Sequence, residues 1–147
     1  MSLLDVNVLL ALAWPNHLHH DAAHDWFAQH RRDGWATCPF TEAAFVRLSS
    51  MPVVVNTAVT AREALQLLQE NTAASDHSFW PNSTRIPELL PEIRERLIGH
   101  QQVNDAILLD LAIRTAGVLV SFDRRIAALL APGSEHASAL EVVRVSE

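Results

Sequence analysis

Short apolar runs alternate with helical patterns along most of this 147-residue chain. The runs predict strands over residues 2–5, 35–38 and 118–122, with a final edge strand over 141–145 and a candidate strand over 77–80. Between them, apolar residues at helical spacing predict helices over 6–14, 21–32, 88–97 and 105–116. This alternation is typical of an α/β fold, a three-layer α/β/α arrangement in which helices cover both faces of a mostly parallel sheet.

Several residues mark the expected helix ends. Thr60–Glu63 has the form of a capping box, which predicts a further helix directly after Thr60. Thr41 is expected to cap the helix after the second strand, and Asn104 to cap the apolar helix over 105–116. Gly117 is expected to end that helix as its C′ residue.

The composition favours one core and excludes several classes of protein. With 49% apolar residues the chain can bury a sizeable core, so one domain over residues 1–147 is expected. No apolar run approaches the roughly 20 residues of a membrane span, and no secretory signal is evident, so we expect a soluble, cytoplasmic protein. The single cysteine, Cys38, is expected to be a small apolar filler. Lysine is absent, which excludes a Walker-type phosphate loop and Schiff-base chemistry.

Four acidic residues take related positions in the predicted fold. Asp5 and Asp123 end strands, whereas Glu42 and Asp105 begin helices. In a parallel sheet all four positions fall at the edge where the strands end and ligands bind. Crowded carboxylates repel one another unless they share protons or a cation, and oxygen ligands suit a hard ion such as Mg²⁺ or Mn²⁺. The sequence therefore predicts a divalent-metal site at this edge.

Each of these acids also has a structural alternative. Taken singly, any of them could cap a helix or interact with the dipole of a first helical turn. Their joint occurrence at one edge, in apolar surroundings, favours the metal site. Asp110 is different, because Arg114 follows it by four residues and the two are expected to form a structural ion pair.

Polar and basic residues complete the predicted site. Asn7 could position a water or a phosphate oxygen, or cap the helix that follows it. Ser121 could hydrogen-bond a ligand carboxylate or simply end its strand. Arg47, Arg124 and Arg125 are candidates for binding phosphates, with ordinary solvent exposure as the alternative. The net charge of −6 disfavours a nucleic-acid partner, but two bound divalent ions would bring it to −2.

Four blocks of the sequence together resemble the PIN-domain ribonucleases of the VapC toxin type. The blocks are SLLDVNVLLALA, FTEAAFVRL, VNDAILLDLA and VLVSFDRRI, in family order and spread over essentially the whole chain. The resemblance assigns the family's four acids to Asp5, Glu42, Asp105 and Asp123, and its first polar residue to Asn7. Ser121 replaces a threonine that is often found there. The resemblance implies a Mg²⁺- or Mn²⁺-dependent endoribonuclease that forms a homodimer and is neutralised by a cognate antitoxin.

On this basis Asp5, Asp105 and Asp123 are expected to be the metal ligands, with Glu42 binding metal or orienting the water. Attack by water rather than by the 2′-hydroxyl would leave 5′-phosphate and 3′-hydroxyl ends. A second hypothesis is an aspartyl-phosphate phosphatase of the haloacid-dehalogenase type, because residues 5–8 are similar to its first motif. Asn7, in place of the second aspartate, and the absence of lysine count against it. A third hypothesis is a PIN fold that binds without catalysis.

Two apolar segments beside turns are candidates for protein contacts. If residues 51–55 and 79–81 are exposed, one is expected to cover a two-fold dimer interface and the other to form a groove for an antitoxin helix. Burial in the core is the alternative for both.

Overall fold

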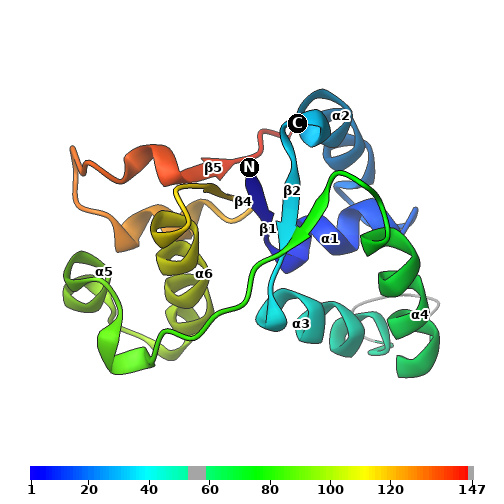
Figure 1. Cartoon of the computed structure of the whole chain (residues 1–147), viewed down its shortest axis with the longest axis horizontal. Coiled ribbons are helices and arrows are strands. Elements are labelled where there is room, and N and C mark those ends of the chain that lie inside the picture. Colours follow the sequence, from blue (N-terminus) through cyan, green and yellow to red (C-terminus); the bar gives the residue numbers. More distant parts are fainter. Residues whose placement is uncertain (53–58, 146–147) are drawn as a thin grey trace.

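The computed structural model describes residues 1–52 and 59–145 and shows a three-layer α/β/α arrangement (Figure 1). Within these residues, five short strands form one wholly parallel sheet in the order β3-β2-β1-β4-β5. They are β1 (Ser2–Leu4), β2 (Trp35–Thr37), β3 (His77–Phe79), β4 (Val118–Ser121) and β5 (Leu140–Val142). The predicted fold class is confirmed, and parallel pairing brings the carboxyl ends of the strands to one edge of the sheet.

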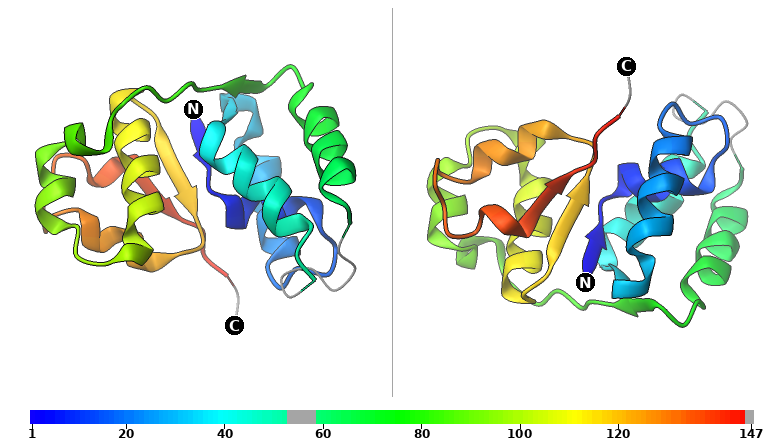
Figure 2. Two further views of the ribbon diagram at one scale, coloured as in Figure 1. Left: turned by 90° about the horizontal axis from the view of Figure 1, so that it is seen from below. Right: turned by 90° about the horizontal axis from the view of Figure 1, so that it is seen from above.

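Helices cover both faces of this sheet. The α-helices are α1 (Val6–Ala13), α2 (His20–His30), α3 (Pro39–Ser49), α4 (Ala61–Thr72), α5 (Pro91–Arg96) and α6 (Val103–Arg114). Short 3-10 helices are η1 (Arg31–Asp33), η2 (Ile86–Glu88), η3 (His100–Gln102), η4 (Arg124–Leu129) and η5 (Ala137–Ala139). Helices α5 and α6 lie on one side of the sheet and α1 to α4 on the other (Figures 1 and 2). Among the described residues, no helix is long and apolar enough to cross a membrane.

The central strands are buried on both faces. Leu3 of β1 and Leu119 of β4 belong to the core cluster beneath α5 and α6. Their neighbours Leu4 and Val120 belong to the cluster beneath α1 to α4. Successive side chains of a strand point to opposite faces, so a strand covered on both sides is apolar throughout. This is why β1 and β4 appear in the sequence as continuous apolar runs.

Two helices begin earlier than the sequence suggests. Helix α3 starts at Pro39, whose missing N–H is harmless at the first helical position, and Cys38 is its N-cap. Thr41 lies inside the first turn, where its hydroxyl accepts a hydrogen bond from the Cys38 N–H at 3.0 Å. Helix α6 starts at Val103 because η3 runs directly into it, which places Asn104 in the first turn. The predictions that Thr41 and Asn104 are N-caps are therefore wrong.

The helix predicted after Thr60 is confirmed, and Thr60 is its N-cap. The Thr60 hydroxyl accepts a hydrogen bond from the Glu63 N–H at 3.1 Å, and the helix begins at the next residue, Ala61. The Glu63 carboxylate accepts from the Thr60 hydroxyl at 3.0 Å, whereas in a capping box it would accept from the Thr60 N–H. The helix predicted over 88–97 is instead divided into η2 and α5, because Pro91 opens a new helix.

The end of α6 has a different geometry from the one expected. The residue in the left-handed conformation is Ala116, with φ +57°, rather than Gly117. The Gly117 N–H donates to the Ala112 carbonyl at 2.8 Å, as in a Schellman motif with alanine at C′. A Cβ on Gly117 would lie 2.5 Å from Cη2 of Trp80 and 2.8 Å from the carbonyl oxygen of Met1. Gly117 is thus required by close packing and not by its own dihedral angles.

Asp110 has the structural role expected of it. Its Oδ1 accepts from Nε of Arg114 at 2.8 Å, and its Oδ2 accepts from the Leu90 N–H at 2.9 Å. The buried carboxylate therefore fixes the chain just before α5. Cys38 is also buried, as predicted.

Candidate active site

Asp5, Asp105 and Asp123 approach one another at the carboxyl edge of β1 and β4. Asp5 directly follows β1, and its backbone N–H donates to the carbonyl of Val120 in β4 at 2.9 Å. Asp123 lies two residues beyond β4, and Asp105 lies in the first turn of α6. The pairing of β1 with β4 therefore joins acids from opposite ends of the sequence.

Asp5 is nearly buried, with 5% of its surface exposed. Its Oδ1 accepts a hydrogen bond from the Val6 N–H at 2.7 Å, so it caps α1. Its Oδ2 accepts from the Ser121 hydroxyl at 2.7 Å. The cap that the sequence allowed for Asp5 is confirmed, and the second oxygen remains tied to the end of β4.

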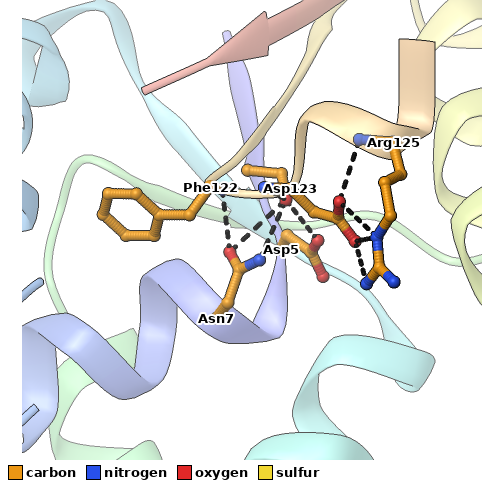
Figure 3. Close-up of polar contacts among 6 residues, drawn as sticks. Asp5, Asn7, Phe122, Asp123 and Arg125 are labelled. Carbon is orange, nitrogen blue, oxygen red and sulfur yellow. Dashed lines mark hydrogen bonds and ion pairs between the residues drawn. The ribbon is translucent and has the colours of Figure 1, made fainter. Parts of the chain in front are cut away.

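Ser121 connects three parts of the site. Its hydroxyl donates to Asp5 and accepts from Nδ2 of Asn7 and from the Asp123 N–H, both at 3.0 Å. Asn7 Oδ1 accepts in turn from the Phe122 N–H at 3.2 Å (Figure 3). A hydroxyl can donate once and accept twice, so the hydrogen-bonding capacity of Ser121 is fully used. These bonds fix the segment after β4 against the first turn of α1.

Burial and mutual repulsion raise the pKa of two aspartates. Burial, followed by the negative charges of Asp5 and Asp123, raises the pKa of Asp105 to about 6. Burial also raises the pKa of Asp5, an effect partly offset by hydrogen bonds from Ser121 and the Val6 N–H. A cation placed here would relieve this repulsion, and oxygen atoms are the donors that Mg²⁺ and Mn²⁺ prefer. The residues therefore fit a hard divalent ion in their chemistry.

Asp123 is paired with an arginine in this conformation (Figure 3). Nε of Arg125 lies 3.0 Å from Oδ1, and Nη2 lies 2.9 Å from Oδ2. These bonds hold the pKa of Asp123 below its usual range. In the two described ranges, no three acidic, histidine or cysteine side chains are grouped closely enough to hold an ion. A cation shared by the aspartates would therefore have to draw them together and compete with Arg125.

Glu42 lies in the first turn of α3, as expected, but its side chain has other partners. The Thr37 hydroxyl donates to Glu42 Oε2 at 2.6 Å and lies 2.8 Å from Nε2 of His77. Because the hydroxyl hydrogen goes to Glu42, His77 is the donor to Thr37 and carries a proton on Nε2. Burial lowers the pKa of His77, and the negative charge of Glu42 partly offsets this. Glu42 is therefore held at the ends of β2 and β3, and β2 is the strand next to β1.

Thr37 and His77 were not singled out from the sequence. Thr37 is the last residue of β2, as Ser121 is the last residue of β4, and a hydroxyl at such a position can orient a nearby carboxylate. The position of Thr37 at a strand end, like that of Ser121, could therefore have indicated its role from the sequence. His77 offered none, because its partner is forty positions away in sequence.

The predicted arginines are placed differently from one another. Arg47 is exposed on α3, and Arg124 is exposed at the start of η4. Arg125 is exposed as well, but its guanidinium is engaged by Asp123. Arg47 and Arg124 are therefore the better placed of the three to contact phosphates in this conformation.

Comparison with known protein families identifies the family of this chain. The model of the PIN domain matches residues 2–130. The chain therefore belongs to the PIN domain family.

Three similar proteins narrow the assignment within that family. Ribonuclease VapC39 of Mycobacterium tuberculosis is 44% identical over 126 residues, which cover 86% of this chain and 91% of the relative. Ribonuclease VapC38 of the same species is 42% identical over 123 residues, or 84% of this chain and 85% of the relative. Ribonuclease VapC44 is 38% identical over 133 residues, or 90% and 93%. The resemblance to VapC ribonucleases seen in the sequence is thereby confirmed.

Proposed function

We propose that this VapC-type toxin endoribonuclease depends on Mg²⁺ or Mn²⁺ and cleaves RNA at the carboxyl edge of β1 and β4. The observation that carries the proposal is the convergence of Asp5, Asp105 and Asp123, from three separate elements, at an edge where burial and mutual repulsion already raise the pKa of two of them. The membership of the PIN family, together with the ribonuclease relatives, disfavours the phosphatase hypothesis.

Asp5, Asp105 and Asp123 would hold the cation. When bound, it supplies Lewis acidity that activates a water for in-line attack on a phosphodiester and offsets the charge developing on the leaving oxygen. Ser121 keeps one oxygen of Asp5 oriented, and Asn7 holds the segment that carries Asp123. These contacts limit the motion of the ligands, which is what neighbouring hydrogen bonds contribute in metal sites generally.

The remaining polar residues act on water and RNA. Glu42, fixed by Thr37, contributes a fourth carboxylate from the β2 side that binds the cation or orients the water. Arg47, Arg124 and Arg125 bind the phosphates that flank the cleaved bond. Because water is the nucleophile, the products carry 5′-phosphate and 3′-hydroxyl ends.

The test is cleavage of structured RNA by the full chain and by Asp105→Asn, with Mn²⁺ and with chelator. Asp105→Asn is expected to lose cleavage, whereas Asp25→Asn, the same change at an exposed site on α2, is expected to retain it. The downstream fragment should be degraded by an exonuclease that requires a 5′-phosphate. Equal cleavage by wild type and Asp105→Asn, or undiminished cleavage in chelator, would contradict the proposal. Inactivity of all three proteins on every RNA tried would favour the non-catalytic hypothesis.

The partners proposed are a cognate antitoxin and a second copy of the chain. Of the candidate contact segments, residues 53–55 lie outside the described residues, so that part of the prediction is not addressed. In the other segment Phe79 is 50% exposed, whereas Trp80 is buried against Gly117. Phe79 and Pro81, which is also exposed, are therefore the residues of that segment available for contact. Light scattering at micromolar concentration should give the mass of a dimer, and the mass of a monomer would refute the homodimer. The product of the adjacent gene should inhibit cleavage, and failure to inhibit it would refute the role of that product as antitoxin.

A further inference from the structure

A pocket of about 360 Å³ opens beside Asp5, between the first turns of α3 and α6. Asp5 and Val6 are among the residues that line it, so the pocket adjoins the proposed site of cleavage. Pockets of this size, of roughly 300–1,000 Å³, are large enough for a small organic group such as a nucleobase.

Most of the α3 wall of the pocket is one helical stripe, with Pro39 and Thr41 lining it as well. Phe40, Ala43, Ala44 and Arg47 all line it, and they follow the i, i+3, i+4, i+7 spacing of one helix face. Phe40, which is 42% exposed, contributes an aromatic ring, and Arg47, about two turns further along α3, contributes a guanidinium. The two alanines between them are too small to fill the hollow.

The opposite wall comes from α6. Asn104 and Leu108 line it one turn apart, and Asn104 directly precedes Asp105. Leu108 is buried and gives an apolar surface, whereas Asn104 is exposed and offers both a donor and an acceptor. The pocket thus combines an aromatic face, an apolar wall, one amide and one cation beside a catalytic carboxylate.

We propose that this pocket binds an unstacked base of the RNA immediately next to the cleaved phosphate. Phe40 stacks on the base, Asn104 hydrogen-bonds its edge, and Arg47 pairs with the adjoining phosphate. Sequence-specific RNA recognition relies on splayed bases that stack on aromatic side chains and are read by hydrogen bonds. The inference rests on the proposed ribonuclease function and adds a determinant of where the enzyme cuts.

The position of the pocket beside Asp5 favours RNA as its occupant. A group bound here lies within one nucleotide of the carboxylates, and Arg47 matches the negative charge of a phosphate backbone. A second copy of the chain and an antitoxin side chain are the competing occupants. Each predicts a different experimental result.

The experiment is a double-mutant cycle between protein and RNA. An oligoribonucleotide containing a mapped cut is prepared with each flanking base removed in turn, and kcat and KM are measured with Mn²⁺ for wild type, Phe40→Ala and Phe40→Trp. Leu65→Ala, which shortens another exposed apolar side chain on α4, is the matched control. Asp105→Asn reports on the proposed function itself.

For wild type, removal of one particular base should lower kcat/KM by about 5- to 150-fold, the range for the loss of one base–aromatic stack. Phe40→Ala should show a similar loss on the intact RNA and little further loss when that base is removed. Phe40→Trp should restore the sensitivity, and Leu65→Ala should behave as wild type. Asn104→Ala should broaden the distribution of mapped cut sites.

Three results would overturn the proposal. One is a wild type that is insensitive to every base removal, and another is a Phe40→Ala protein that is as sensitive as wild type. The third is a changed molecular mass of Phe40→Ala in light scattering, which would assign Phe40 to a contact between copies. In all three, wild type still cleaves and Asp105→Asn does not, so the ribonuclease function stands. If Asp105→Asn cleaves as well as wild type, the proposed function and the pocket's role fail together.

Discussion

The hydroxyl of Ser121 donates a hydrogen bond of 2.7 Å to Oδ2 of Asp5, across the pairing of β4 with β1. This bond favours the ionised form of Asp5 and counteracts the effect of burial on its pKa. We expect Ser121→Ala to lower metal affinity or kcat by about 10- to 100-fold, as loss of a contact to a ligand commonly does. Ser121→Thr should stay within a few-fold of wild type because it keeps the hydroxyl. Calorimetric Mn²⁺ titration and cleavage kinetics would check this, and equal losses in the two variants would argue against the hydrogen bond as the cause.

The pH dependence of stability should reveal the repulsion at Asp105. Its pKa is about 6 in the folded chain and 3.8 ordinarily, so the folded state holds the proton more tightly than the unfolded state. Protonated Asp105 therefore stabilises the fold. This stabilisation is fully present below pH 4 and is lost as pH rises through about 6. In chelator, Asp105→Asn should exceed wild type by about 1 kcal/mol at pH 7.5, a value reduced for partial exposure, and by little at pH 4. Urea unfolding at both pH values measures the difference in free energy of unfolding between the variant and wild type. The same difference at both pH values would contradict the prediction.

Arg125 should compete with the cation for Asp123. Removing its guanidinium leaves the carboxylate free and makes the site more negative. Arg125→Ala is expected to tighten Mn²⁺ binding by up to about 5-fold, the range for a solvent-exposed ion pair. Arg124→Ala, the same change one residue earlier, should have a smaller effect. Weaker Mn²⁺ binding by Arg125→Ala would indicate that Arg125 supports the site.

Thr37 is expected to affect cleavage by orienting the carboxylate of Glu42. Thr37→Val preserves the shape of this fully buried side chain but removes the hydroxyl that holds the carboxylate. We expect kcat to fall about 10-fold with little change in KM, since the effect concerns orientation and not RNA binding. Thr37→Ser retains the hydroxyl and should keep most of the activity. Unchanged kcat in a folded Thr37→Val protein would show that the orientation of Glu42 is unimportant.

The two residues after α6 should respond oppositely to substitution. Ala116 has φ +57°, so Ala116→Gly should stabilise the protein by about 1 kcal/mol. Gly117→Ala should destabilise it by about 1–3 kcal/mol, because the new Cβ would overlap the rigid ring of Trp80 and the backbone of Met1. Thermal unfolding of both variants measures these changes. Stabilisation by Gly117→Ala would mean that Trp80 can move aside.

The sequence predicted the layered fold well because β1 and β4 are buried on both faces and appear as plain apolar runs. It misplaced the starts of α3 and α6, where the cap is Cys38 or Gln102 and neither is a common capping residue. The N-cap preferences of residue types favoured Thr41 and Asn104, but each lies inside a helix that begins at Pro39 or Val103.

Some features of the candidate site could be predicted from the sequence and others could not. The three aspartates could be placed together because each adjoins a strand end or a helix start, positions that parallel topology brings to one edge. The pairing of Asp123 with Arg125 and the contacts of Glu42 with Thr37 depend on side-chain conformations. Periodicity and spacing carry no information about such side-chain conformations.

The wholly parallel sheet also has a practical consequence for anyone who handles the protein. β1 starts at Ser2, at the opposite edge of the sheet from Asp5. At that edge the Met1 carbonyl accepts a hydrogen bond from the Val118 N–H. A purification tag or surface linker placed ahead of Met1 would therefore leave on the far side from the aspartates. β5 runs the same way as β1, so a tag that continues from its carboxyl end departs from the side where RNA is proposed to bind. Cleavage assays and immobilised binding measurements are best made with the amino-terminal attachment.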